Sequence, residues 1–192
     1  MTFTPAAGGF RFITRSAAQT RILDAALALI GENGVGGTSL QMIADIIGVT
    51  KAAVYHQFKT KEEIVVALTE RELGELEEAL ELAEAEQSPP RARELLLEGV
   101  IDVTVRRRGA ASTLQFDPVI VRLLAEHQPF QQFIARLYGV LVGEEGDDAV
   151  VSAAMLSGAI AVGVMHPLVG EIDDETLRAQ LLRLTKRFIE PR

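Results

Sequence analysis

The sequence contains no cysteine and only three histidines, His56, His127 and His166. The absence of cysteine excludes disulfide bonds, thiolate metal sites and thiol nucleophiles. The three histidines are too scattered for a metal-ligand spacing, so we predict no metal site and no cofactor. The enzyme motifs HExxH and GxSxG and the phosphate-binding P-loop are also missing, and this argues against an enzyme.

The N-terminus shows no charged segment that leads into an apolar run and a cleavage site. No signal peptide is therefore recognised, and we expect a cytoplasmic protein. The chain has 192 residues, of which 48% are hydrophobic and 24% are charged. This length is sufficient for one large or two small domains with a substantial core, and the composition is not that of a disordered segment.

The net charge of −8 is distributed unevenly along the chain. Residues 1–61 contain six Lys or Arg and three acids, a net charge of +3, whereas the remaining residues contain 13 Lys or Arg and 24 acids, a net charge of −11. Opposite signs in the two parts indicate that only the first part faces a polyanion such as nucleic acid. Chance clustering of charges is the alternative.

Helical periodicity runs through almost the whole chain, whereas strand alternation is nearly absent, so we predict an all-α fold. At three places a Ser or Thr is followed three residues later by Gln or Glu. In such a pair, each side chain accepts a hydrogen bond from the backbone N–H of the other residue, which is typical of a helix start. These pairs are Ser16 with Gln19, Thr38 with Gln41, and Thr60 with Glu63. They predict helices over about residues 17–33, 39–46 and 61–86, and Thr50 predicts a short helix over residues 51–57.

The segments 39–46 and 51–57 have the spacing of a helix-turn-helix. Ala44, Gly48 and Val54 stand four and then six residues apart. Such a motif needs a small residue where the helices cross, a residue that tolerates positive φ in the turn, and an apolar residue that locks the second helix onto the first. The second helix of a helix-turn-helix enters the major groove of DNA.

The exposed side of this predicted second helix has side chains suited to DNA. Hydroxyl and ammonium groups can bind bases or phosphates, an alanine methyl can contact thymine, and tyrosine and histidine can reach the backbone or a base. The predicted DNA-binding residues are Thr38, Thr50, Lys51, Ala52, Tyr55, His56, Lys59 and Lys61. For His56 the alternative is a surface position without contact, and for Tyr55 it is packing of the ring against the first helix.

Residues 38–64, TSLQMIADIIGVTKAAVYHQFKTKEEI, resemble the DNA-binding segment of TetR-type transcriptional regulators. The positions that carry the resemblance are Thr38, Ala44, Gly48-Val49-Thr50, Tyr55, Phe58 and Lys61. Ala52-Ala53 stand where the family often has a glycine, which leaves the base preference open. A helical hairpin from some other protein is the alternative. The resemblance implies a three-helix DNA-binding domain over residues 1–60 and a helical effector-binding and dimerisation domain over residues 61–192.

Residues 1–15 precede the first predicted helix and contain Arg11 and Arg15. These two arginines are candidates for a flexible arm that binds DNA. An arm without a function is the alternative.

The resemblance also implies an effector cavity among the central helices. The aromatic residues between about residues 113 and 144 have helical spacing, for which core packing is the alternative role. The residues predicted to line or border the cavity are Phe116, His127, Phe130, Phe133 and Tyr138. An apolar cavity with few polar groups suits a small lipophilic effector.

Residues 149–165, AVVSAAMLSGAIAVGVM, form an apolar run without a charge. Seventeen residues make a helix of about 26 Å, which is shorter than the roughly 30 Å of a hydrocarbon core. Small residues at four-residue spacing, such as Ala154 and Gly158, allow another helix to approach closely. We therefore predict a fully buried helix and no membrane association.

The last predicted helix, about residues 175–189, has an apolar seam with spacings of four, three and four, as in helical bundles. In the TetR family the last two long helices pair with their copies in a second subunit. The resemblance thus implies a dimer interface that includes Ala154, Gly158, Leu177, Leu181, Leu184 and Phe188. Closure of the chain's own core by this seam is the alternative.

These observations predict a ligand-responsive repressor that binds a palindromic operator in double-stranded DNA as a homodimer. An enzyme built on a helical bundle would need one of the missing motifs. An architectural DNA-binding protein would be basic throughout, which the net charge of −11 beyond residue 61 contradicts.

Overall fold

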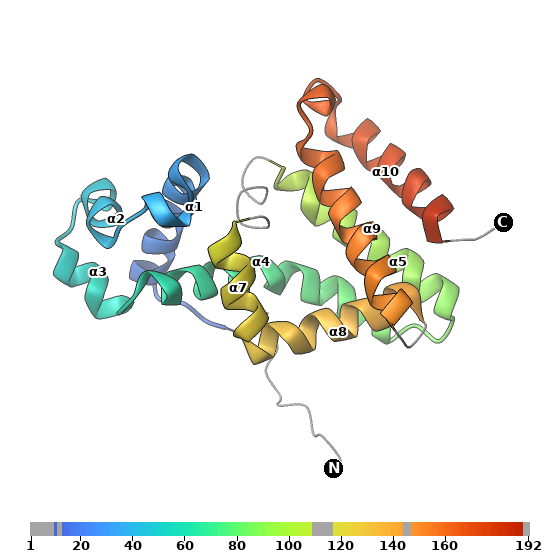
Figure 1. The fold of residues 1–192 in the computed structure, drawn as a ribbon, viewed down its shortest axis with the longest axis horizontal. Helices are drawn as coiled ribbons and strands as arrows, with labels where there is room; N and C mark the ends of the chain where they lie inside the picture. The colour runs from blue at the N-terminus through green and yellow to red at the C-terminus, as the bar shows by residue number, and fades with distance from the viewer. Residues whose placement is uncertain (1–9, 11–12, 109–116, 144–146, 190–192) are drawn as a thin grey trace, which may run out of the picture. The chain divides into compact units, whose positions relative to one another are not determined.

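A computed structural model describes residue 10 and residues 13–108, 117–143 and 147–189 of the protein, and these are helical without any strand (Figure 1). The prediction of an all-α fold is confirmed. The elements are α1 (Ala17–Gly37), α2 (Leu40–Ile47), α3 (Lys51–Gln57), α4 (Lys61–Glu84), α5 (Pro89–Arg106), α7 (Pro118–Glu126), α8 (Gln128–Val142), α9 (Asp147–Met165), the 3-10 helix η2 (Pro167–Val169) and α10 (Asp174–Ile189).

The chain folds into two compact units. Unit 1 contains α1, α2, α3, α4 up to Glu75, and α7, while unit 2 contains the rest of α4, α5, α8 from Gln131, α9 and α10. The division differs from the predicted boundary at residue 60, because the first turns of α4 belong to the core of unit 1. Ile64, Val65 and Leu68 of α4 are buried there against the other helices.

The core of unit 1 is built on the apolar side of α1. Leu23 and Ala26 have 0% exposure, and Ile22, Leu29 and Ile30 are also buried. These positions recur every three or four residues, so they share one side of the helix. Figure 1 shows α2 and α3 lying beside α1, and Ile43, Ala44, Val54 and Phe58 from this pair complete the same core.

The α1 helix starts where the capping box predicts. The Ser16 hydroxyl accepts a hydrogen bond from Gln19 N, and the Gln19 side chain accepts one from Ser16 N. The pairing predicted for Thr38 is wrong, because α2 begins one residue later. Ser39 caps it by accepting from Met42 N at 3.2 Å, and Thr38 caps the end of α1 instead.

Gly34 interrupts α1 near its predicted end. Its backbone has φ 70° and ψ 170°, a conformation that is essentially restricted to glycine. The regular helix therefore stops before Gly34, as the sequence predicts, and one further turn leads to Thr38. We call residues Gly34 to Thr38 the α1–α2 junction.

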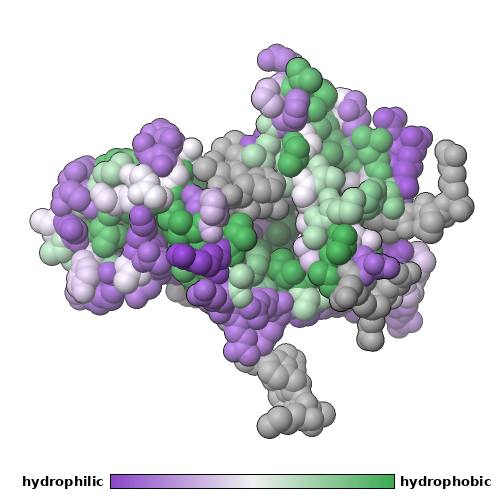
Figure 2. All heavy atoms as spheres, viewed as in Figure 1, coloured by the Kyte–Doolittle hydropathy of each residue, from purple (hydrophilic) through white to green (hydrophobic). Residues whose placement is uncertain are grey.

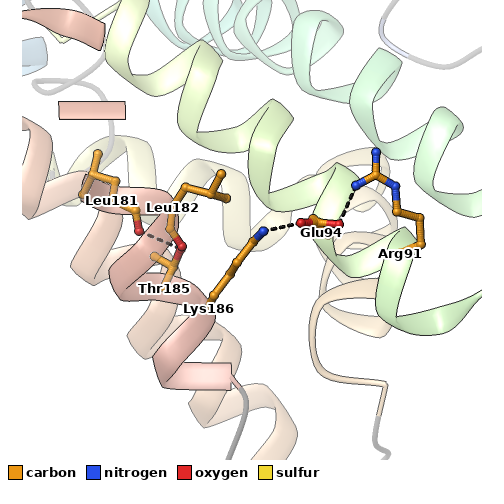
Figure 3. A network of polar contacts seen from close by, with 6 residues as sticks. All are labelled: Arg91, Glu94, Leu181, Leu182, Thr185 and Lys186. Atoms are coloured by element: carbon orange, nitrogen blue, oxygen red, sulfur yellow. Dashed lines mark hydrogen bonds and ion pairs between the residues drawn. The ribbon is translucent and has the colours of Figure 1, made fainter. Parts of the chain in front are cut away.

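In unit 2, α9 and α10 pack on each other and on α5 (Figure 1). The Lys186 ammonium of α10 donates to Glu94 of α5, which also accepts from Arg91, and nearby Thr185 donates to Leu181 O at 2.8 Å (Figure 3). The contact between Lys186 and Glu94 joins α10 to α5, whereas the other two contacts lie within single helices.

The prediction that the apolar run of α9 is fully buried is wrong for this chain alone. Ala153, Leu156, Ile160, Ala161 and Val164 are buried, but the other side of α9 is open to solvent. Figure 2 shows apolar side chains along α9 on the visible face. The exposed large apolar residues of α9 are Val150, Val151, Met155, Val162 and Met165, each at least 36% exposed.

Candidate nucleic-acid interface

The packing of α2 against α3 has the geometry of a helix-turn-helix. Ala44 and Val54, the residues predicted at the crossing and the lock, are both 0% exposed. Gly48 ends α2 in the left-handed conformation with φ 70° and ψ 38°, and Val49 N donates to Ala44 O at 3.0 Å. This conformation favours glycine because it has no Cβ. The turn predicted from the sequence is thus confirmed.

The start of α3 is fixed by its cap. Thr50 has extended backbone angles, and its hydroxyl oxygen accepts from Ala53 N at 3.2 Å. The hydroxyl hydrogen stays available for an outside acceptor, because a hydroxyl is both a donor and an acceptor.

The side of α3 that faces away from the core exposes most of the predicted DNA-binding residues. Tyr55 is 52% exposed, and the Lys59 ammonium lies 4.8 Å from the centre of its ring, within cation–π distance. The exposed members of the predicted set are Thr50, Lys51, Ala52, Tyr55, His56 and Lys59. The alternative that the Tyr55 ring packs against α1 does not fit its exposure.

Two predicted residues, Thr38 and Lys61, are instead engaged within the protein. Thr38 is 2% exposed, and its hydroxyl donates to Gly34 O at 2.9 Å. The Lys61 ammonium donates to Val35 O at 2.6 Å and to Thr38 O at 3.1 Å. Both side chains hold the α1–α2 junction, so their role as phosphate ligands is not supported by their placement.

Arg15, predicted as part of a flexible arm, is bound to α4. Its guanidinium lies 2.6 Å from a Glu70 carboxylate oxygen, and its side chain is only 14% exposed. Arg15 therefore anchors the start of α1. Arg11 lies outside the described residues.

Sequence reasoning missed three contacts that hold α1 and the helix-turn-helix in place within unit 1. The Arg21 guanidinium of α1 donates to Ile47 O at the end of α2, at 3.0 Å. Arg71 of α4 pairs with Asp24 of α1 at 2.6 Å. The third contact comes from Asp117, which precedes α7. An Asp before a Pro signals a helix start, but nothing in the sequence indicates its distant partner.

That partner is the α1–α2 junction. The Asp117 carboxylate accepts from Val35 N at 3.0 Å with one oxygen and from Val119 N at 2.8 Å with the other. Burial raises the pKa of Asp117, but the backbone N–H groups of Val35, Val119 and Ile120 and the nearby Lys61 charge outweigh this effect and lower the pKa overall. Asp117 is therefore ionised at neutral pH.

The predicted effector residues are divided between the two units. His127 and Phe130 belong to unit 1, and His127 Nε2 lies 4.0 Å from Glu70 Oε1. Phe133 and Tyr138 belong to unit 2, where Phe133 is 2% exposed and the Tyr138 hydroxyl lies 3.5 Å from Ser157 Oγ. Phe116 lies outside the described residues.

Unit 1 has an open groove of about 450 Å³, which none of the predicted effector residues lines. It is bordered by Arg15, Gln57, Phe58, Thr60, Glu62, Glu63, Val66, Ala67 and Glu70. Its mixed polar and apolar lining does not match the apolar cavity expected for a lipophilic effector.

The predicted dimer residues fall into two groups. Leu177 and Leu181 are 2% and 9% exposed, so in the single chain they pack within its own core. Leu184 and Phe188, at 53% and 54% exposure, lie open on α10. On α9, Ala154 is exposed and Gly158 is half-buried.

The described part of the chain holds no group of three or more His, Cys, Asp or Glu side chains placed to bind a metal ion. Among the same residues, none of the helices combines the length and apolar composition needed to cross a lipid bilayer.

Comparison with known proteins extends these observations. The sequence model of the family described as "Bacterial regulatory proteins, tetR family" matches residues 22–68. The HTH-type transcriptional regulator AcrR of Shigella flexneri is 44% identical over 68 residues, which cover 33% of this chain and 32% of the relative. The chain thus matches about a third of the length of this curated relative.

Two solved structures are similar over nearly the whole chain. A transcriptional regulator of the TetR/AcrR family from Thermobifida fusca YX-ER1 is 29% identical with a TM-score of 0.57, over 92% of this chain and 100% of that one. The transcriptional regulator FadR from Bacillus subtilis, in complex with stearoyl-CoA, is 22% identical with a TM-score of 0.68, over 89% of this chain and 99% of that one.

Residues 22–68 thus match the TetR family of bacterial regulatory proteins, and the whole chain shares the fold of a solved TetR/AcrR-family regulator. The resemblance seen in residues 38–64 is therefore confirmed. The similar proteins are regulators of transcription and not enzymes, in agreement with the class predicted from the sequence.

Proposed function

We propose that the protein is a ligand-responsive transcriptional repressor that binds a palindromic operator as a homodimer. The observation that carries this proposal is the exposed side of α3, where Lys51, Tyr55 and His56 extend from a helix whose opposite side is locked by buried Val54. Exposed donors on a rigid helix of this size fit the major groove.

Each exposed residue has a distinct task in this proposal. Thr50 and Lys51 lie at the N-terminal end of α3, where side chains of a recognition helix reach base edges. Ala52 contacts a thymine methyl, and Tyr55 and His56 bind the backbone or a base. Lys59 follows α3 and binds phosphate, while its contact with the Tyr55 ring limits the positions of both side chains.

A homodimer accounts for the open apolar surface of α9 and α10. Met155, Leu184 and Phe188 are each more than half exposed in the single chain, and such residues on neighbouring helices favour burial in an interface. Two copies related by a two-fold axis place two recognition helices on half-sites about 34–36 Å apart.

The effector proposed here is a small lipophilic molecule bound in the helical body. The proposal is supported by the similar FadR structure from Bacillus subtilis, which is a complex with stearoyl-CoA. The effector favours a conformation in which the two helix-turn-helix motifs no longer match the half-sites, and it acts only through its difference in affinity for the two conformations. A regulator of this kind works in the cytoplasm, where the DNA is.

The first test measures DNA binding by the full chain. Fluorescence anisotropy compares a labelled duplex from upstream of the protein's own gene with a random duplex of equal length, across a salt series. A regulator prefers the upstream duplex, whereas equal affinity for both would indicate an architectural protein and would refute the proposal. Binding to neither duplex would also refute it.

A variant tests the assigned surface. The triple change Lys51→Ala, Tyr55→Ala, Lys59→Ala is expected to weaken specific binding by roughly 10- to 100-fold or more and to reduce the salt slope by about 1, since the phosphate contact of Lys59 disappears. Arg122→Ala is the control, because Arg122 is an exposed cation of unit 1 on α7, outside the helix-turn-helix. Unchanged affinity of a folded triple variant would remove α3 from the interface.

A further inference from the structure

The α1–α2 junction is held from two sides through one residue. The N–H of Val35 donates to Asp117 at 3.0 Å, and its carbonyl accepts from Lys61 at 2.6 Å. Asp117 precedes α7 and Lys61 begins α4, so two helices outside the helix-turn-helix bind the same residue. All of these groups belong to unit 1.

The position of the junction determines where α2 begins. Val35 is 1% exposed, Thr38 N donates to Val35 O at 3.3 Å, and Ser39 follows as the cap of α2. Gly34 next to Val35 has backbone angles that only glycine adopts readily, so the chain direction changes there. The Val35 side chain packs in the core of unit 1, whereas its backbone N–H and carbonyl are held by Asp117 and Lys61.

Asp117 has two separable roles. With Oδ1 it caps α7 through Val119 N, which any short polar residue can do. With Oδ2 it reaches Val35 N, 82 residues away along the chain, and capping does not require this contact.

We infer that Asp117 is a positioning residue for DNA recognition, which sets the start of α2 by holding Val35 N–H. The inference rests on the proposed function, because it assumes that the helix-turn-helix reads DNA. The inference gives Asp117 a role in DNA specificity, although Asp117 lies outside the DNA-binding surface and does not touch DNA.

The test separates the two roles of Asp117. Asp117→Ser keeps a hydroxyl that caps α7 but is too short to reach Val35, so it removes only the long-range bond. The matched control is Asp173→Ser, because Asp173 caps α10 by accepting from Thr176 N at 2.9 Å and belongs to unit 2. Both variants lose one carboxylate at a helix start.

A preferred duplex is first selected from a random pool by the full wild-type chain. Dissociation constants for this duplex and for a random duplex are then measured for wild type, Asp117→Ser and Asp173→Ser. We expect Asp117→Ser to lower the ratio of specific to non-specific affinity about tenfold while the non-specific affinity and its salt slope stay unchanged. Asp173→Ser is expected to keep the wild-type ratio.

A merely structural role for Asp117 would lower the melting temperature without changing this ratio in the folded protein, and that result overturns the inference. If Asp117→Ser does not fold, Asp117→Asn serves instead, because its amide still caps α7 but presents only one acceptor oxygen for two N–H groups. An unchanged ratio in folded Asp117→Asn also overturns it. If wild type selects no duplex, the proposed function fails and the inference fails with it, whereas selection by wild type with an unchanged ratio in the variant refutes the inference alone.

Discussion

Lys61 and Lys59 allow a direct comparison between a lysine with a structural role and a lysine proposed to bind DNA. The Lys61 ammonium donates to Val35 O at 2.6 Å and to Thr38 O at 3.1 Å. Lys61→Met keeps most of the apolar stem but removes every donor, so two carbonyl groups lose their partner. A hydrogen bond to a charged group contributes about 1.5–3 kcal/mol, and water can replace part of it at a half-buried site. We expect the free energy of unfolding to fall by about 1–3 kcal/mol.

Thermal unfolding followed by circular dichroism measures this loss. For a chain of this size the melting temperature should fall by about 2–4 °C for each kcal/mol, at a fixed protein concentration. Lys59→Met is the control, because Lys59 is exposed and contacts only the Tyr55 ring face through its ammonium. It should leave the melting temperature nearly unchanged and weaken binding to operator DNA.

The opposite pattern would refute the reasoning. If Lys61→Met melts like wild type and loses DNA affinity as Lys59→Met does, the Lys61 ammonium binds phosphate, as the sequence predicted, and does not hold the α1–α2 junction.

Three further predictions concern stability and assembly. A Cβ on Gly99 would stand 2.3 Å from the Ala79 Cβ, so Gly99→Ala should cost about 1–3 kcal/mol in urea unfolding, and adding Ala79→Gly should restore part of this. Phe188→Lys should sediment as a folded monomer, because Phe188 is 54% exposed in the single chain, and a persisting dimer would exclude it from the interface. The Thr176 N–H lowers the pKa of Asp173, so the stabilisation is present above about pH 4 and lost as the pH falls through the lowered folded pKa. Asp173→Asn should flatten this acid dependence of the urea midpoint.

The helix-turn-helix could be predicted from the sequence because its determinants are local. The cap at Thr50 and the positive φ at Gly48 depend on residues within a few positions, and the observed geometry agrees at both. Thr38 shows the limit of such patterns. Ser39 has the same capping chemistry one residue later, and the choice between them depends on burial of Thr38 and on its bond to Gly34 O.

Long-range contacts were not predictable in the same way. Asp117 and Val35 are 82 residues apart, and no local pattern joins them. Glu77 lies in a strongly acidic helix, yet its side chain is buried, with 2% exposure and a contact of 3.2 Å to Arg136. Its place on the buried side depends on how α4 packs.

The apolar run of α9 shows why hydropathy does not give burial in a single chain. Ala153, Leu156 and Ile160 lie on the buried side of α9, whereas Met155 and Val162 are more than half exposed. A periodic pattern places residues on sides of a helix, but whether the second side meets its own chain or another copy depends on assembly.

The hydrogen bond between Asp117 and Val35 has a consequence for how motion can pass along unit 1. The two atoms lie 3.0 Å apart, and a hydrogen bond is no longer effective when this distance grows beyond about 3.5 Å. A displacement of α7 by well under the width of one atom is therefore enough to weaken the hold on the Val35 N–H. Because the strength of a hydrogen bond falls off continuously with distance, we expect the start of α2 to loosen progressively as α7 moves away.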